Sequence, residues 1–291
     1  MIIMKITDGL GNQMFQYAYA KALQIMFSQK VYLDINDINN IKNRQVRESG
    51  WIELCDQRKY QLDNFLITLP SINAEKIPQR NEVILSKNKF LRYCDELRLL
   101  PIVYIKEADC NEAGMKLKYQ RYRKYYLEGS FFDKNYYGAI ENILRQEYQL
   151  KNKLCIPNVI GRNLKNRNTV SVHIRRKDFL RVGRNISEGD YYKKAIAYIG
   201  QRIEKPVLFI FSDDIEWVKS QMTFDWEYIL ISEYGFSDCE EMILMSMCKN
   251  NIIANSTFSY WGAWLNPNIE KTVIAPRGWR QKIIPDSWVL L

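Results

Sequence analysis

Histidine, long apolar runs and closely spaced cysteines are scarce or missing in this sequence of 291 residues. With a single histidine, His173, and six cysteines that form no Cys-x-x-Cys pair, a zinc site is not expected. No stretch approaches the roughly 20 apolar residues that a membrane-spanning helix needs, and the apolar run at 1–6 is too short for a secretory signal. We therefore expect a cytoplasmic protein whose scattered thiols stay reduced.

The composition is that of a globular protein with a basic surface. Hydrophobic residues make up 47% of the chain, enough for a sizeable core, and the net charge is +9. Such a charge suits nucleic acid, an anionic membrane surface or a phosphorylated substrate, or is simply a soluble basic surface. The basic, aromatic stretch at 116–126 leaves peripheral contact with the inner membrane open, although a solvated helix face accounts for it better.

The N-terminal stretch predicts a β-loop-α-β unit. Its expected elements are, in order, a strand, a glycine loop, a helix and a strand, at 2–6, 7–13, 14–27 and 31–34. Gly11 and Asn12 lie in the loop, where backbone N–H groups at a helix start can approach a phosphate. Because Gly-x-Gly-Asn-Gln is neither the dinucleotide fingerprint nor a P-loop, a plain tight turn is an equally good interpretation.

Residues 35–125 are less regular, because prolines and polar clusters interrupt the periodicity. The elements expected there and just beyond are two helices, a strand and a third helix, at 87–99, 107–119, 126–133 and 135–149. The polar stretch 151–168 then marks a domain boundary. We expect a first domain over 1–160 and a second over 161–291, and leave open whether the C-terminal tail packs back on the first.

The second half alternates strands with helices at regular spacing. Strands are predicted at 169–174, 207–211, 228–231, 251–254 and 272–275, with helices at 191–204, 215–222, 238–248 and 260–265. This alternation indicates a parallel sheet covered on both faces. Ligands of such sheets bind beyond the carboxyl ends of the strands.

Polar side chains gather after three of these strands. They are His173, Arg175, Arg176 and Asp178, then Ser212, Asp213 and Asp214, then Asn255, Ser256, Thr257, Phe258 and Ser259. Arginine forks and a Ser/Thr helix start suit the phosphates of a nucleoside diphosphate, and a carboxylate could accept the N1–H and amine of guanine. Each cluster also has a plainer interpretation, as a solvated basic loop or as helix caps. The recurrence at three strand ends favours a ligand site.

A metal is not expected at this site. Asp213 and Asp214 are adjacent at a helix start, so their side chains point in different directions and do not chelate together. Arg175 and Arg176 can neutralise a diphosphate leaving group in the place of a metal.

Three blocks resemble the bacterial α-1,2-fucosyltransferases of glycosyltransferase family 11. They are Gly9–Ala18, the run from His173 to Asp178, and the run from Asn255 to Leu265, which is the most specific of the three. The endings around 275–279 and 285–288 are also similar, so the resemblance spans nearly the whole chain. One departure is Asp8, where the family usually has glycine.

The resemblance implies an α/β protein of GT-B type, with two Rossmann-like domains facing each other across a cleft. The first would hold the acceptor and the second GDP-β-L-fucose. It further implies metal-independent, inverting transfer to the 2-hydroxyl of a terminal galactose in an oligosaccharide or a lipid-linked glycan, as in building surface polysaccharide. The alternatives are fucosyl transfer of another linkage or acceptor, of the α-1,6 or O-fucosyl type, transfer from another nucleotide sugar, and a non-catalytic binder of nucleotide or RNA.

The resemblance also suggests roles for single residues. Arg175, or else Arg176, would hold the β-phosphate. His173 and either Asp213 or Asp214 would contact the guanosine half. Further contacts to the diphosphate would come from Ser256, Thr257, Ser259 and, from the first domain, Asn12. For the base that inversion needs, Asp178 is the first candidate, with Glu128 and Asp133 as alternatives, although Asp178 is better explained as a partner that holds an arginine in place.

Overall fold

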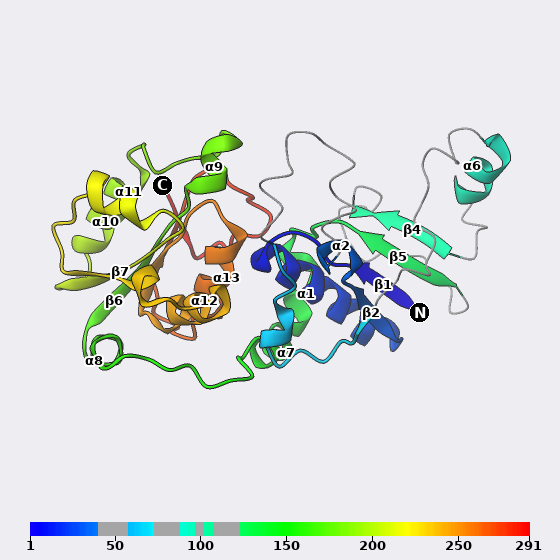
Figure 1. Cartoon of the computed structure of the whole chain (residues 1–291), viewed down its shortest axis with the longest axis horizontal. Helices are drawn as coiled ribbons and strands as arrows, with labels where there is room; N and C mark the ends of the chain where they lie inside the picture. Colours follow the sequence, from blue (N-terminus) through cyan, green and yellow to red (C-terminus); the bar gives the residue numbers. More distant parts are fainter. Residues whose placement is uncertain (40–57, 73–87, 97–101, 108–122) are drawn as a thin grey trace. The chain divides into compact units, whose positions relative to one another are not determined.

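The computed structural model describes residues 1–39, 58–72, 88–96, 102–107 and 123–291. The chain divides into two compact units, residues 1–149 and 150–291, and each is built on its own β-sheet (Figure 1). In the described part, no helix is long and apolar enough to cross a membrane. The helix expected over 107–119 lies almost wholly outside the described residues, as does most of the basic stretch 116–126.

The first unit contains a parallel sheet with the order β3-β2-β1-β5-β4. Its strands are β1 Ile2–Lys5, β2 Val31–Asp34, β3 Ser71–Ile72, β4 Ile102–Lys106 and β5 Lys124–Glu128. Its helices are α1 Leu10–Phe27, α2 Asn36–Asn39, α6 Lys89–Glu96 and α7 Glu141–Glu147, with 3-10 turns η1 Leu62–Asn64, η3 Lys134–Tyr136 and η4 Gly138–Ile140. The predicted β-loop-α-β start is confirmed, and the weakly patterned stretch holds two strands, β3 and β4, that we did not predict.

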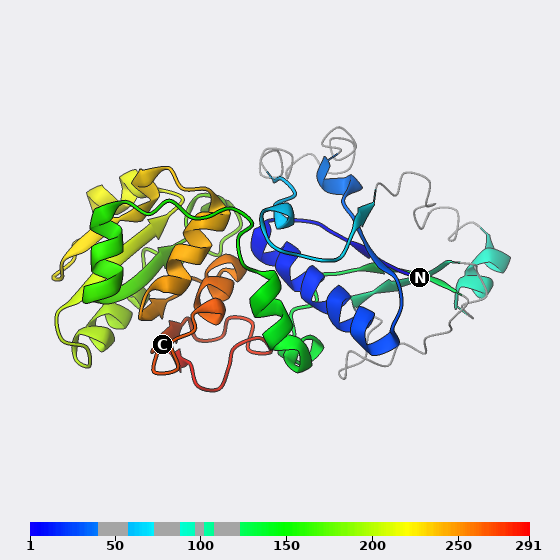
Figure 2. The ribbon, with the colours of Figure 1, turned by 90° about the horizontal axis from the view of Figure 1, so that it is seen from below.

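Helix α1 begins four residues earlier than its apolar periodicity predicts. The backbone N–H groups of Asn12 and Gln13 already bond to the carbonyl oxygen of Gly9, so Gly11 and Asn12 lie in the first turn of the helix and not in a loop. The helix then runs along the first sheet, and nearly all of its residues up to Leu23 are buried (Figure 2).

The single helix expected over 135–149 is wrong. Asp133 caps η3 by accepting the backbone N–H of Asn135, and Gly138 opens the second 3-10 turn, η4, so that a regular helix starts only with α7. Aspartate at a cap and glycine in an interior position both disfavour a continuous helix.

The second unit has a parallel sheet with the order β11-β10-β9-β6-β7-β8. Its strands are β6 Asn168–Ile174, β7 Pro206–Ser212, β8 Tyr228–Leu230, β9 Asn250–Ile252, β10 Val273–Ala275 and β11 Val289–Leu290. Its helices are α8 Asn158–Asn166, α9 Lys177–Arg181, α10 Tyr191–Gly200, α11 Ile215–Gln221, α12 Asp238–Met247 and α13 Thr257–Leu265. The predicted alternation is confirmed, and α8, α9 and β11 are additions to it.

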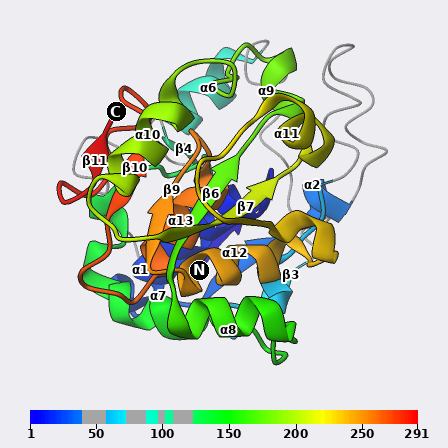
Figure 3. The same ribbon diagram turned by 90° about the vertical axis from the view of Figure 1, so that its left-hand side faces the viewer.

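Helices lie on both faces of this sheet, α10 and α11 on one and α8 and α12 on the other (Figure 3), and an apolar cluster lies on each face. Val170, Val172 and Leu208 face α10 and α11, whereas Phe209 and Phe211 face α8 and α12. Every residue of β7 is buried, as expected for a central strand of a doubly covered parallel sheet. Since the strands are parallel and in register, their carboxyl ends meet at one edge, which we call the carboxyl edge.

Candidate functional site

Arg175 follows β6 directly and is held by two carboxylates at the carboxyl edge. Its Nε and Nη2 each donate to Asp178 at 2.8 Å, a bidentate pair, and its Nη1 lies 3.2 Å from Oδ2 of Asp213. Three of the five guanidinium N–H groups are thus engaged, and two remain for a ligand. The side chain is 31% exposed.

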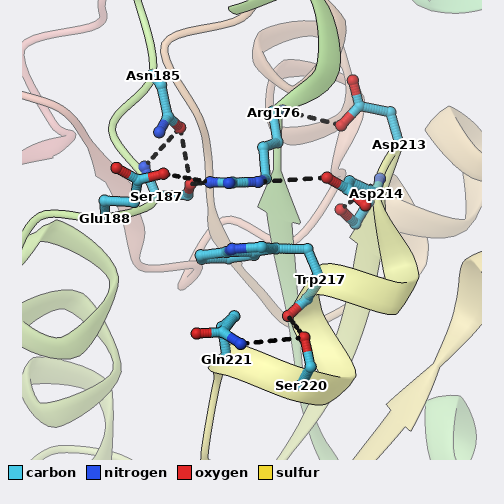
Figure 4. Close-up of polar contacts among 10 residues, drawn as sticks. Arg176, Asn185, Ser187, Glu188, Asp213, Asp214, Trp217, Ser220 and Gln221 are labelled. Atoms are coloured by element: carbon cyan, nitrogen blue, oxygen red, sulfur yellow. Dashed lines mark hydrogen bonds and ion pairs between the residues drawn. The ribbon is translucent and has the colours of Figure 1, made fainter. Parts of the chain in front are cut away.

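Arg176 is less exposed than Arg175, and Figure 4 shows the residues around its guanidinium. Its Nη1 donates to Oγ of Ser187 at 3.0 Å and to Glu188 at 2.8 Å, and its Nε lies 3.2 Å from Asp214. The guanidinium carbon stands 4.0 Å from the ring centroid of Trp217. With its side chain only 11% exposed, Arg176 is packed between a loop and α11.

The two adjacent aspartates serve different partners, as their adjacency predicts. Asp213 accepts the backbone N–H of Arg176 at 2.8 Å and faces Arg175, whereas Asp214 faces the guanidinium of Arg176. Burial raises the pKa of Asp213, and Arg175 and the Arg176 backbone N–H oppose that rise. Among the described residues, no group of three or more His, Cys, Asp or Glu side chains has an arrangement that could hold a metal ion.

His173 is buried at the end of β6, with its ring 5.3 Å from that of Phe258 at the start of α13. Its Nδ1 has no hydrogen-bond partner among the described residues, and neither has the buried Oδ1 of Asn255, whose Nδ2 donates to the carbonyl of Arg184. Burial, aided by the nearby Arg175, lowers the pKa of His173 to about 3. The imidazole is therefore neutral at pH 7, and two buried polar atoms lack the partners that such atoms normally have.

The serines predicted to contact the ligand are engaged in local hydrogen bonds. Ser256 caps α13 by accepting the N–H of Phe258, and Oγ of Ser259 bonds to the backbone of Ala254 and Ser256. Ser212 accepts the backbone N–H of Asp214 in the turn before α11. Thr257 is partly buried in the first turn of α13. The capping interpretation holds for Ser256, and local hydrogen bonds also occupy Ser212 and Ser259, so only backbone N–H groups or a rotated hydroxyl would serve a ligand.

Two carboxyl groups on α12 belong to this region and carry no motif that points to them. Asp238 is close enough to Arg175 to raise its pKa, although burial works against that rise. Burial raises the pKa of Glu241 to about 7; Asp238 and Asp213 add to the rise, and a hydrogen bond with Ser232 opposes it. Because Ser232 also accepts the N–H of Ser212, Glu241 is linked to the end of β7.

The corresponding edge of the first unit is held by neutral amides. Gln13 and Gln16 are fully buried in α1. Gln13 donates to the carbonyls of Asp8 and Lys59 and accepts the N–H of Gln61, all at 2.9–3.0 Å. Gln16 bonds the backbone and hydroxyl of Thr7 and the carbonyl of Gly129. Gln13 and Gln16, both within the block Gly9–Ala18, thus shape the loop after β1, a role that we did not predict.

Asp8 adopts φ 66°, the left-handed region, in this loop. Glycine reaches this conformation without strain, so the turn keeps a glycine-like shape although its first residue is aspartate. The side chain stays 44% exposed, with Thr7 donating to it and Arg58 at 4.0 Å.

The other carboxylates considered as a base are already engaged. Glu128 accepts from Lys5 at 2.9 Å, and Asp133 is buried as the cap of η3. Asp178 uses both oxygens to hold Arg175. Its position therefore agrees with the role of a partner that holds an arginine, and its role as a base stays a prediction.

The arrangement can bind an anion through a small number of donors. Four carboxylates touch the two guanidinium groups: Asp178 and Asp213 on Arg175, and Asp214 and Glu188 on Arg176. Arg175, whose side chain is 31% exposed, lies near the neutral His173, and the buried Oδ1 of Asn255 has no hydrogen-bond partner among the described residues. A ligand with anionic oxygens next to hydrogen-bonding groups, such as a nucleoside diphosphate, has the matching chemistry.

Comparison with known proteins gives matches along the chain. The profile described as Glycosyl transferase family 11 matches residues 1–283. The O-antigen biosynthesis glycosyltransferase WbnK of Escherichia coli is 32% identical, over 98% of this chain and 99% of that protein. An alpha-1,2-colitosyltransferase of Escherichia coli is 28% identical, over 99% and 98% of the two chains. A mouse galactoside 2-alpha-L-fucosyltransferase, Sec1, is 29% identical over 33% of this chain and 28% of its own length.

Among solved structures, POFUT1 in complex with GDP-fucose matches with a TM-score of 0.50, covering 100% of this chain and 97% of that one. The sequence identity is 12%, so this likeness concerns the fold alone. Together with the two parallel α/β units, it confirms the predicted GT-B type of fold.

Proposed function

The chain belongs to glycosyl transferase family 11, and from this premise we propose that it transfers L-fucose from GDP-β-L-fucose to the 2-hydroxyl of a terminal galactose, with inversion. The observation that carries the proposal is Arg175, a partly exposed guanidinium whose orientation is fixed by two carboxylates. A binder of RNA would not need such an oriented cation beside a buried neutral histidine.

Arg175 is the residue to which we assign the β-phosphate. When the bond between fucose C1 and the phosphate oxygen breaks, negative charge grows on the departing GDP. A guanidinium held in place before the reaction stabilises that charge at no reorganisation cost, and one such donor is worth about 2.7–4 kcal/mol in comparable sites. Because both oxygens of Asp178 bond to Arg175, we assign Asp178 to holding it, with a part in accepting the proton of the acceptor hydroxyl left to experiment.

We place the guanosine half of the donor next to His173 and Asn255. Their unpaired Nδ1 and Oδ1 atoms would gain a donor or acceptor from the ligand. Asp213 and Asp214 are committed to the arginines, so a contact from either to guanine would be shared with an arginine. Since guanidinium groups can offset the charge of the diphosphate, we propose that transfer proceeds without a divalent metal.

The acceptor and the sugar follow from the relatives. The mouse relative is named as acting on a galactoside, and the WbnK relative is named for O-antigen biosynthesis, which supports a galactose-terminated surface glycan as acceptor. The colitosyltransferase supports a second candidate, transfer of a colitosyl group with the same α-1,2 linkage. Both candidates share the guanosine diphosphate site, and they differ only in the sugar.

The experiment that tests the proposal is a transfer assay with GDP-fucose, a panel of β-galactosides and EDTA in the buffer. We expect fucosylated product with the new linkage at O2, by NMR, and an unchanged rate when EDTA is present. A parallel assay with a colitosyl donor separates the two sugars. No product from GDP-fucose with any galactoside would overturn the fucosyl proposal, and a rate that EDTA abolishes would overturn metal independence.

A further inference from the structure

We propose that Trp217 is a positioning residue, which acts through Arg176 to hold the loop 183–190 at the carboxyl edge of the second sheet. We call this loop, which connects α9 to α10, the strap. The inference depends on the proposed function only for the identity of the ligand that the edge takes.

The indole ring of Trp217 stacks on the guanidinium group of Arg176. The guanidinium carbon lies 4.0 Å from the indole centroid, and Figure 4 shows the ring flat against the guanidinium plane. Stacking of this kind restricts the guanidinium to one plane while leaving its N–H groups free to bond sideways. Trp217 belongs to α11, so a helix that packs on the sheet fixes the orientation of the Arg176 guanidinium plane.

Within that plane, the guanidinium of Arg176 contacts two separate segments of the chain. On one side Nη1 reaches the strap, at Ser187 and Glu188, and on the other Nε faces Asp214 in the turn before α11. Arg176 therefore connects the strap to the end of β7. Ser187 is itself held by two hydrogen bonds to Asn185 within the strap, so the anchored point is a defined turn (Figure 4).

Besides these contacts the strap is fixed by Ile186, which packs against the apolar cluster that faces α10 and α11. The strap contains no helix or strand, and few backbone hydrogen bonds involve it, among them those from the N–H of Arg184 to Phe179 and from Gly189 to Ile186. A second side-chain tie comes from Asn255, whose Nδ2 donates to the carbonyl of Arg184 at 2.8 Å. Segments with few internal bonds open at low free energy, so the position of the strap depends on these two polar ties together with the packing of Ile186.

Arg176 and Asp213 link the strap to Arg175. The backbone N–H of Arg176 bonds to one oxygen of Asp213, and the other oxygen of Asp213 faces Arg175. A displaced Arg176 would therefore also displace the carboxylate that orients Arg175. We assign Arg176 to positioning, in contrast to the phosphate contact that the sequence left open for it. Its Nη1 bonds to the strap, its Nε forms an ion pair with Asp214, and its side chain is only 11% exposed.

The test compares Trp217→Leu, which removes the ring, with Trp217→Phe, which keeps one. The matched control is Tyr198→Leu, because Tyr198 makes the same kind of contact with Arg202, at 3.5 Å, on α10 away from the carboxyl edge. Hydrogen exchange of residues 183–190 in the free protein reports on the strap. The Michaelis constant for the donor and kcat report on the site.

We expect Trp217→Leu to speed exchange in the strap and to raise the donor KM about tenfold, the scale of a lost guanidinium–ring contact, with kcat changed less than about threefold. In Trp217→Phe the strap exchange rate and the donor KM should both lie close to the wild-type values. Tyr198→Leu should match the wild type in both. Unchanged strap exchange in Trp217→Leu would overturn the proposal. A second result would also overturn it: Arg176→Gln lowers the affinity for the donor substrate about a hundredfold while Trp217→Leu keeps the wild-type affinity. Arg176 would then be a direct ligand of the substrate. Exchange needs no substrate, so a wild type inactive on GDP-fucose would sink the proposed function and leave this test intact.

Discussion

The carboxyl edges of the two sheets are stabilised in opposite ways. In the first unit, two fully buried glutamines, Gln13 and Gln16, hold the loop after β1 through neutral hydrogen bonds to backbone groups. In the second unit, two arginines hold the strand ends through carboxylates. Both edges follow the same β-loop-α pattern, so the difference lies in the side chains and not in the topology.

The two kinds of side chain have different consequences for ligand binding. Neutral amides that satisfy buried backbone groups fix a loop but gain nothing from an incoming anion. Guanidinium groups that are partly exposed can exchange or extend their bonds when an anion arrives. The first edge should therefore respond to mutation mainly in stability, and the second mainly in ligand binding and rate.

The largest expected effect is on the rate, from Arg175→Ala. Loss of an oriented donor to the leaving phosphate should lower kcat/KM by about two to three orders of magnitude, and Arg175→Lys should recover only part because the fork is lost. Steady-state transfer kinetics measure this. Arg167→Ala is the matched control, since Arg167 pairs with Glu227 on the surface just before β6 begins. A wild-type rate in Arg175→Ala would show that the Arg175 guanidinium does not stabilise the leaving phosphate.

The next effect is on stability, from Gln13→Ala in the other edge. The substitution leaves the N–H of Gln61 and the carbonyls of Asp8 and Lys59 without their partner, and should lower the free energy of unfolding by about 2–4 kcal/mol. Urea denaturation measures it. The exposed Gln221→Ala should stay within about 0.5 kcal/mol of the wild type. Equal losses in the two variants would contradict the assigned role of Gln13.

A third prediction concerns the pH dependence of stability, through His173. Its folded pKa, about 3, lies below the unfolded value of about 6.5, so the unfolded chain binds a proton more readily. Stability should therefore fall as the pH drops below 6.5, by about 2 kcal/mol between pH 7 and 5 from this group alone. His173→Gln should lack that part of the slope in denaturation measured at both pH values. An identical slope in the variant would show that His173 does not titrate as described.

The regular parts of this molecule could be predicted and the irregular contacts could not. Strands β6 and β7 are marked by apolar runs, and the cap at Ser256 by its position before α13. Trp217 and Ser187 carry no sequence signal, because they meet Arg176 only after the strap and α11 have folded back. Gln13 was visible in the motif, but its partners at Lys59 and Gln61 lie more than 40 residues away.

Two smaller errors have the same physical origin. Strand β4 lies in a weakly patterned region and is placed by pairing with β5, a contact that local periodicity does not report. Helix α1 starts early because of the turn at Asp8 and Gly9, whose backbone geometry overrides the polar appearance of residues 11–13. In both cases tertiary or turn geometry decided the outcome over local pattern.

The smallest expected effect comes from Asp8→Gly. Because Asp8 has φ 66°, glycine should relieve backbone strain and stabilise the first unit by up to about 1 kcal/mol after its greater unfolded-state entropy is allowed for. Thermal unfolding measures the sign. Asp8→Asn, which tolerates the same backbone region, should leave stability nearly unchanged. A destabilised Asp8→Gly would mean that the contacts of the carboxylate with Thr7 and Arg58 outweigh the strain.

The central claim is that the carboxyl edge of the second unit binds the guanosine diphosphate of the donor through Arg175. Calorimetric titration of GDP into the wild type, Arg175→Ala and Arg167→Ala, at one fixed salt concentration, tests it most directly. We predict that GDP binds the wild type and Arg167→Ala equally, and binds Arg175→Ala at least about tenfold more weakly, in keeping with a lost charge-assisted pair. Equal GDP affinity in all three proteins, or no binding of GDP by the wild type, would contradict the account.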